Sequence, residues 1–229
     1  MRFLLAVLIS LPILAQQKIE TLPPGIRILE PGGYWESEHT EIQGKWLAVC
    51  LSQGKGHLKL TTLLRKHPKG EDEIVTLSSK QKMIGKAWLF IQGVKNTTNS
   101  KSGVWSYSLE RAIGGGDFND NHRTVAITHP SLGQIQIVFD PSLNGESNGK
   151  FGFNFVSGKT NQRLELDEGC NGCYLHSLFL MDIDGDGFPD LVVKYGSYPG
   201  FSNTMLFLSS KALPNELLAQ AARLTYGGE

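Results

Sequence analysis

Short apolar runs that alternate with polar residues recur along the chain from residue 45 onward. Phe151, Phe153 and Phe155 occupy every second position of one run, so their side chains share one face of an extended strand. Comparable runs recur roughly every 8 to 15 residues between turn residues. This pattern is typical of antiparallel sheets that pack as a sandwich or close as a barrel, and 26 glycines suit the many turns. We therefore expect a mostly β fold.

The predicted strands cover most of the chain after residue 45. They span residues 46–51, 58–64, 74–77, 88–94, 104–109, 124–128, 134–139, 151–156, 164–166, 174–181 and 191–195. One short C-terminal helix is expected over 215–224, because Pro214 suits a first turn and good helix formers follow it. The alternative is that the last residues return as an edge strand. No long internal repeat is visible, so a propeller would be partial at most.

Residues 1–15 have the features of an export signal. Arg2 provides the positive start, residues 3–14 are almost wholly apolar, and Ala15 precedes the expected cleavage site. The apolar run is shorter than the roughly 20 residues that a spanning helix needs. An uncleaved membrane anchor is therefore the weaker alternative. We expect an exported protein, periplasmic or secreted, with no stable membrane insertion.

The rest of the chain divides into two parts by composition. Residues 16–44 are rich in proline and glycine, which predicts an extended leader that packs on the domain edge or stays mobile. Residues 45–229 carry the alternating runs, and this length is enough to bury one full core. We predict a single β-rich domain over 45–229.

The charge balance argues against a nucleic-acid partner. The chain has 22 basic and 22 acidic residues, so it offers no general attraction to nucleic acid or to anionic membrane. Lys55, Lys59, Arg65 and Lys66 are scattered along strand-like segments, as on a solvated face.

Four aspartates between residues 182 and 190 form the strongest chemical signal. Asp182, Asp184, Asp186 and Asp190 occupy loop positions 1, 3, 5 and 9, with a glycine at position 6. Alternate side chains of such a curled loop, together with the Phe188 carbonyl, can converge on Ca²⁺, which takes six to eight oxygen ligands. The alternative is an acidic turn, because Asp-Gly pairs often join two strands. We predict a calcium-binding hairpin over 182–190, with these four aspartates and Phe188 as ligands.

The residues around the loop are strand-like. An EF-hand needs a glutamate at position 12, where this chain has Val193, and no helical pattern follows. Residues 182–193 resemble the FG-GAP/VCBS repeats, the calcium loops of integrin-type propeller blades, whose core is D-x-D-G-D-G-x-x-D followed by apolar residues. The resemblance covers one copy of the motif and implies a calcium loop between two strands.

A second group of oxygen donors follows the glycines at 114–116. Asp117, Asn119 and Asn121 form a possible second cation loop, although His122 stands where the calcium loop has glycine. A plain polar turn is the competing interpretation, because asparagine and aspartate are common turn residues.

Cys50, Cys170 and Cys173 give an odd count for an exported chain. Oxidising compartments favour disulfides, so we expect one bridge and one remaining thiol. A bridge between Cys170 and Cys173 would close a small ring across Asn171-Gly172, whereas a bridge from Cys50 to either would tie together distant parts of the domain. A redox-active thiol is less favoured in a strand-rich setting, and a metal site is less favoured outside the cytosol.

The chain lacks the common catalytic motifs. It has no Gly-x-Ser-x-Gly elbow, no closely spaced histidine pair and no phosphate-binding loop. The first hypothesis is a calcium-binding structural or binding module, such as a periplasmic inhibitor or interaction protein with a protein partner in the cell envelope. The alternative is an exported hydrolase of cell-wall or polysaccharide material with calcium as a structural ion. A third is a propeller fragment that assembles with copies of itself.

Overall fold

The computed structural model describes residues 25–35, 42–53, 55–66, 74–95, 100–109, 124–139, 150–168, 173–197 and 201–226. The predicted signal at 1–15 lies outside these residues. Within them the chain forms four antiparallel sheets, none of which closes into a barrel. The predicted mostly β, antiparallel fold is therefore confirmed. No helix in the described part of the chain is long and apolar enough to cross a membrane.

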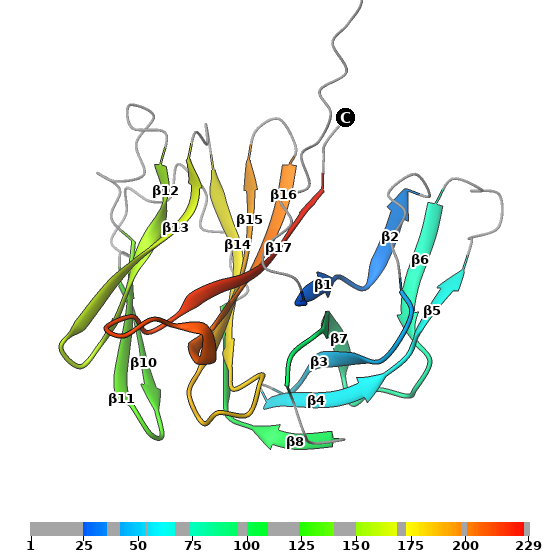
Figure 1. Cartoon of the computed structure of the whole chain (residues 1–229), viewed down its shortest axis with the longest axis horizontal. Coiled ribbons are helices and arrows are strands. Elements are labelled where there is room, and N and C mark those ends of the chain that lie inside the picture. The colour runs from blue at the N-terminus through cyan, green and yellow to red at the C-terminus, as the bar shows by residue number, and fades with distance from the viewer. Residues whose placement is uncertain are drawn as a thin grey trace, which may run out of the picture.

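We number the sheets in the order in which they stack (Figure 1). Sheet 1 contains β10 (Thr124–His129), β11 (Gly133–Val138), β12 (Lys150–Ser157) and β13 (Thr160–Glu168). Sheet 2 contains, in spatial order, β17 (Ala219–Tyr226), β16 (Phe201–Leu208), β15 (Asp190–Ser197), β14 (Tyr174–Met181) and β9 (Ser106–Leu109). Sheet 3 contains β1 (Arg27–Leu29), β7 (Lys86–Gln92), β3 (Trp46–Ser52), β4 (Lys55–Thr61) and β8 (Ser100–Val104). Sheet 4 contains β2 (Gly32–Trp35), β6 (Ile74–Ser79) and β5 (Leu63–Lys66).

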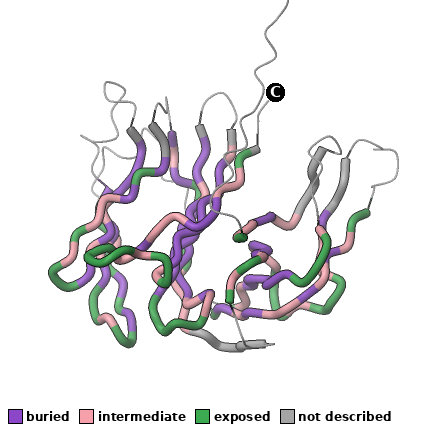
Figure 2. The backbone as a smooth tube through the Cα atoms, viewed as in Figure 1, coloured by how far each residue is buried: buried purple, intermediate pink, exposed green. Residues whose placement is uncertain are grey.

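Three layers of apolar side chains fill the spaces between successive sheets. The first joins sheets 1 and 2 and contains the three phenylalanines of β12. The second joins sheets 2 and 3, and the third joins sheets 3 and 4 around the fully buried Trp46. Figure 2 shows that buried backbone is concentrated in the strands of sheet 2. Sheet 2 is thus covered on both faces.

Burial on both faces explains the consecutive apolar residues 178–181 of β14 and 191–193 of β15. Leu178 and Leu180 pack toward sheet 1, whereas Phe179 and Met181 pack toward sheet 3. A strand with one wet face would place polar residues at every second position. The run over 191–195 was predicted to be a buried strand, and β15 confirms it.

The predicted C-terminal helix over 215–224 is wrong. β17 pairs with β16 along the length of both strands, with a bulge between Leu206 and Phe207. Ala221 and Ala222 are buried in the core between sheets 2 and 3. Pairing and burial outweigh helix propensity, which is a weak local preference. The helical turn in this region is shorter and earlier, a 3₁₀ helix over Ser209–Lys211.

Two long predicted runs are each divided between two sheets. The run over 58–64 ends one strand at Thr61, in sheet 3, and begins the next at Leu63, in sheet 4. The run over 104–109 is divided in the same way at Trp105, between sheets 3 and 2. Each short break carries the chain from one layer to another.

The described part of the predicted leader contributes strands to two sheets. β1 pairs with β7 at the edge of sheet 3, and β2 pairs with β6 in sheet 4. Between them Glu30 forms an ion pair with Lys194 of sheet 2 at 2.8 Å and accepts a hydrogen bond from Thr204. The ammonium group of Lys194 also lies 4.6 Å from the centre of the Trp88 ring of sheet 3. This segment therefore contacts three of the four sheets.

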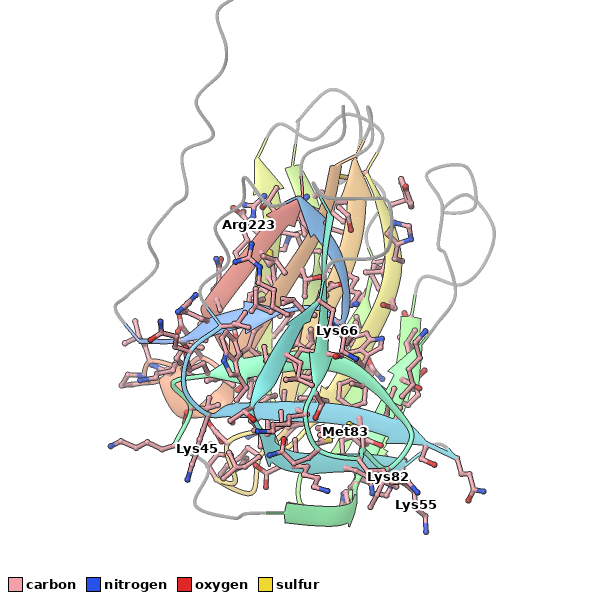
Figure 3. The ribbon with its side chains drawn as sticks, turned by 90° about the vertical axis from the view of Figure 1, so that its right-hand side faces the viewer. Lys45, Lys55, Lys66, Lys82, Met83 and Arg223 are labelled. Carbon is pink, nitrogen blue, oxygen red and sulfur yellow. The ribbon has the colours of Figure 1, made fainter. Side chains whose placement is uncertain are left out.

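The four basic residues singled out in the sequence lie in pairs on two strands, β4 and β5. Lys55 belongs to sheet 3 and Lys66 to sheet 4, and they lie at different heights in Figure 3. Both are exposed, as is Arg65. Lys59 is half-buried, and its ammonium group donates to the Lys82 carbonyl at 2.8 Å.

Candidate metal centre

The acidic loop connects β14 and β15 at one end of sheet 2. Gly185 and Gly187 have φ values of 85° and 91°, in the left-handed region that glycine reaches without steric cost. These two positions let the chain curl back on itself within a few residues. Ile183 turns inward and is fully buried in the core between sheets 2 and 3. This apolar side chain therefore anchors the loop to the core between sheets 2 and 3.

Three of the four loop aspartates converge. Asp182, Asp184 and Asp190 each provide one carboxylate oxygen, and these oxygens lie within 4.8 Å of one another. Asp182 and Asp184 are half-buried, whereas Asp190 is fully buried. Carboxylates this close repel one another unless a cation or a proton offsets their charge.

Asp190 is the most deeply buried of the three carboxylates, and it accepts four hydrogen bonds. Its Oδ2 accepts hydrogen bonds from the backbone N–H groups of Ile183 at 2.7 Å and Asp184 at 3.2 Å. Its Oδ1 accepts from the backbone N–H of Ser209 at 2.9 Å and from the Ser209 hydroxyl at 3.1 Å. Asp190 therefore joins the acidic loop to the segment that follows β16.

Burial changes the acidity of the cluster. The pKa of Asp190 is raised to about 7: loss of solvation is the largest cause and the neighbouring charge of Asp184 adds to it, while three backbone hydrogen bonds act in the opposite direction. Burial also raises the pKa of Asp184, and the hydrogen bond from Ser210 partly offsets this. The protein thus holds these carboxyl groups where their charged forms are costly, and a cation would remove that cost.

Two of the clustered carboxylates retain capacity for a ligand. Asp182 accepts from the N–H groups of Gly185 at 2.7 Å and Gly187 at 3.3 Å. Asp184 accepts from the N–H of Asp186 at 3.3 Å and from the Ser210 hydroxyl. An ionised carboxylate has about four lone-pair sites. With two donors each from the described residues, Asp182 and Asp184 have lone pairs left for a cation.

Asp186 does not belong to the three-carboxylate group. It is exposed, and it accepts from the N–H of Phe188 at 2.8 Å and from the Ser209 hydroxyl at 2.9 Å. The Phe188 side chain is 49% exposed. Ligation by Asp186 and by the Phe188 carbonyl stays a prediction from the loop spacing.

The two serines are the part of the site that sequence reasoning missed. Ser209 and Ser210 lie nineteen or more residues beyond the acids that they contact. The pairing of Leu191 with Phe207 places the end of β16 beside the start of β15. A hydroxyl pair after a strand is a weak signal by itself, and only this register brings it to the loop.

The charge of the acidic loop affects the pKa of His129, a histidine of sheet 1. Burial lowers the pKa of His129, and the negative charge of Asp182 partly offsets this. The Nδ1 atom of His129 accepts hydrogen bonds from the N–H groups of Ser131 and Leu132 at 3.2 and 3.3 Å. Its ring meets Trp105 edge to face, with ring centres 4.5 Å apart. The acidic loop therefore lies close enough to sheet 1 for an electrostatic interaction.

The remaining predicted sites are settled only in part. Asp117, Asn119 and Asn121 lie outside the described residues, so the second cation loop stays a prediction.

Cys50 is a free, buried thiol, which contradicts a bridge from Cys50. It lies in the core between sheets 3 and 4, and burial raises its pKa to about 11. Cys173 is disulfide-bonded, and Cys170, one of the two partners considered for it, is outside the described residues.

Comparisons with protein families, with curated proteins and with solved structures found no match to this chain. The resemblance of residues 182–193 to FG-GAP/VCBS loops therefore stays a resemblance.

The chemistry of the site is clearer than its family. The converging side chains offer only carboxylate oxygens, a donor set that suits hard cations and not soft ones. The cluster of Asp182, Asp184 and Asp190 could therefore hold a metal ion.

Proposed function

We propose that this chain is an exported calcium-binding β protein that acts as a structural or binding module in the cell envelope or outside the cell. The observation that carries the proposal is the convergence of Asp182, Asp184 and Asp190 at the end of sheet 2. A buried carboxylate at the base of a glycine-containing loop is a costly arrangement, and a bound cation offsets the cost. The export signal predicted over 1–15 and the FG-GAP/VCBS-like spacing support the same function.

Calcium suits the loop better than magnesium does. Ca²⁺ accepts six to eight oxygen ligands in flexible geometries, whereas Mg²⁺ requires a near-ideal octahedron and gives up its water reluctantly. The curled loop offers three carboxylates, of which two are half-buried and one is fully buried. Extracellular calcium would fill such a site without a dedicated cage. The ion would then neutralise the cluster and stabilise the folded state by mass action.

A protein partner is the binding target that we favour. Phe188 and Leu213 are exposed large apolar side chains, at 49% and 66% exposure. Phe188 belongs to the acidic loop, and Leu213 follows the 3₁₀ helix that holds Ser209 and Ser210. The two connections hydrogen-bond to each other, so a partner that contacted both side chains would depend on the conformation of the loop.

The hydrolase alternative has less support. It requires a concave site with two carboxylates roughly 5 to 10 Å apart. A cavity of about 290 Å³ lies on sheet 1 and is lined by Leu132, Gln134, Gln136, Val156 and Gly158, none of them ionisable. A site of this composition offers neither a general acid nor a nucleophilic carboxylate.

Calcium titration calorimetry on the mature protein tests the proposal. We expect one saturable heat of binding in the wild type and its loss in Asp184→Ala, because that change removes one of the three converging carboxylates. Asp186→Asn then tests whether Asp186 is also a ligand: its affinity stays within about threefold of wild type, a difference below roughly 1 kcal/mol, if the three converging carboxylates decide binding, and falls further if Asp186 ligates the ion. Equal heats in wild type and Asp184→Ala would refute the calcium site.

Export has its own test. N-terminal sequencing of protein recovered from the periplasm or medium is expected to begin at Gln16. Retention of the full chain in the cytoplasm would contradict the proposed location.

A further inference from the structure

The connection between β16 and β17, residues 209–218, is attached at its first residues to the acidic loop. We call this connection the strap. The backbone N–H of Ser209 donates to Asp190 at 2.9 Å, and the Ser209 hydroxyl reaches the same carboxylate at 3.1 Å. The Ser210 hydroxyl donates to Asp184. The first residues of the strap therefore hydrogen-bond to two of the three carboxylates that converge in the candidate metal centre.

The other end of the strap is attached to sheet 1. Gln162 of β13 accepts hydrogen bonds through Oε1 from the backbone N–H groups of Leu217 at 2.7 Å and Leu218 at 2.9 Å. The Nε2 of Gln162 donates to the Leu218 carbonyl at 2.6 Å. The Leu218 side chain is buried in the core between sheets 1 and 2. One glutamine thus fixes three backbone groups of the strap.

Short internal hydrogen bonds stiffen the strap between these two attachments. The N–H of Ala212 donates to the Ser209 carbonyl at 3.0 Å, closing the 3₁₀ turn. The N–H of Glu216 donates to the Leu213 carbonyl at 2.9 Å, and the Glu216 carboxylate accepts from the N–H of Leu213 at 3.0 Å. These hydrogen bonds restrict the conformations open to the strap between its two attachments.

We propose that the strap couples the acidic loop to sheet 1, so that calcium in the loop holds the strap against Gln162 and loss of calcium loosens it. The inference rests on the calcium-binding function proposed above. Without a cation, repulsion among the carboxylates favours their separation and moves Asp184 and Asp190 away from the two serines. With a cation, the carboxylates stay together and both attachments of the strap persist.

Amide hydrogen exchange in the full mature chain, followed by NMR with calcium or with a chelator, tests the coupling. The amide protons of Ser209, Leu217 and Leu218 are suitable probes because the acceptor of each is known. Local openings set such exchange rates. We expect calcium to slow exchange at all three amides by about tenfold or more. The amide of Ala48, on the central strand β3 of sheet 3 and buried between sheets 3 and 4, serves as the internal control and is expected to change little.

A double variant separates the two ends of the strap. In Ser209→Ala with Ser210→Ala, the three hydroxyl bonds to the loop are absent, while the backbone N–H of Ser209 and the side chain of Gln162 are intact. We expect calcium to bind this variant with a measurable heat, and its effect on exchange at Leu217 and Leu218 to fall severalfold. Gln136→Met, a change on β11 that touches neither the loop nor the strap, is expected to keep the full wild-type response.

Calorimetry run in parallel distinguishes the two ways of failing. A wild-type calcium heat without any change in exchange at Leu217 and Leu218 overturns the coupling and leaves the calcium site standing. A full exchange response in the double serine variant also overturns it, because the serines would then not transmit the effect. The absence of any calcium heat in wild type removes the proposed function and the coupling together.

Discussion

The strands β10 to β13 of sheet 1 and β14 to β17 of sheet 2 share one topology, four consecutive antiparallel strands, but they are buried differently. Sheet 1 packs one face against sheet 2, and its strands alternate buried and exposed residues, as in β10. Sheet 2 is buried on both faces, and β15 is apolar at successive positions. The same topology therefore requires two different sequence patterns, which depend on the number of covered faces.

The connections between the strands of the two sheets also differ in how far they are buried. In sheet 1, β12 and β13 are joined by an exposed two-residue turn in which Gly158 has a φ of 59°. In sheet 2, the acidic loop ends in the buried Asp190 and the strap ends in the buried Leu218. A connection at the end of a doubly covered sheet has neighbouring layers to pack against, so it can bury polar groups that a free hairpin leaves in water. This is why the candidate metal centre lies on sheet 2.

The largest expected effect comes from the core that sheet 2 shares with sheet 3. Phe179 is fully buried, and its ring centre lies 5.1 Å from that of Trp88. Phe179→Ala removes an aromatic side chain from a packed interior, and we expect the free energy of unfolding to fall by about 3 to 5 kcal/mol. Urea denaturation followed by circular dichroism measures the change.

The matched substitution lies on the open face of sheet 1. Gln134 is exposed, so Gln134→Lys is expected to change stability by less than about 0.5 kcal/mol. Similar losses in both variants would contradict the difference in burial between the two sheets.

A smaller effect is expected from the buried end of the acidic loop. Asp190→Ala leaves the N–H groups of Ile183, Asp184 and Ser209 without their acceptor, and buried unsatisfied donors are costly. We expect the metal-free protein to lose about 2 to 3 kcal/mol of stability in denaturant melts. Asp186→Ala, on the exposed side of the same loop, is expected to cost less than about 0.5 kcal/mol. If Asp186→Ala were the more damaging of the two, the loop would not be anchored through Asp190.

The smallest effect is a dependence of metal-free stability on pH. The pKa of Asp190 is raised to about 7 in the folded protein, above its ordinary value of 3.8. Between these values the folded state binds more protons than the unfolded state, so stability falls as pH rises. We expect the chelated protein to melt roughly 5 °C lower at pH 8 than at pH 5, and calcium to remove most of the difference.

Comparison with Asp190→Asn isolates this contribution, because other groups titrate in the same range. Burial lowers the pKa of His129 and of His176, so these two residues favour the folded state at higher pH. The asparagine variant keeps their contributions and lacks that of Asp190. An identical pH dependence of melting in wild type and Asp190→Asn would show that Asp190 does not titrate as proposed.

Much of the fold was predictable from local patterns. Alternation revealed the strands of sheet 1, and an uninterrupted apolar run revealed β15. β16 was not predicted, because Ser202, Asn203 and Thr204 interrupt its apolar pattern, although Asn203 and Thr204 are buried between paired strands. The C-terminal helix was wrong because partners far away in the sequence decide whether Ala219–Tyr226 pairs as a strand.

The candidate site was predictable to a similar degree. The spacing of acids and glycines between two strand-like segments predicted the loop and three of its converging carboxylates, Asp182, Asp184 and Asp190. The exposed position of Asp186 follows from the direction of the curl, which spacing does not specify. The contacts of Ser209 and Ser210 follow from the pairing of β15 with β16.

By itself the sequence determined that this protein is built of antiparallel strands and that one connection gathers carboxylates, since both properties depend on residues within a few positions of each other. The tertiary structure decided which aspartate is buried, which serines meet the acids and how the loop is linked through the strap to sheet 1. Those features depend on register and on the covering of sheet 2 by layers distant in the chain. No local pattern contains them, because the free energy of burying Asp190 depends on the groups that surround it in space.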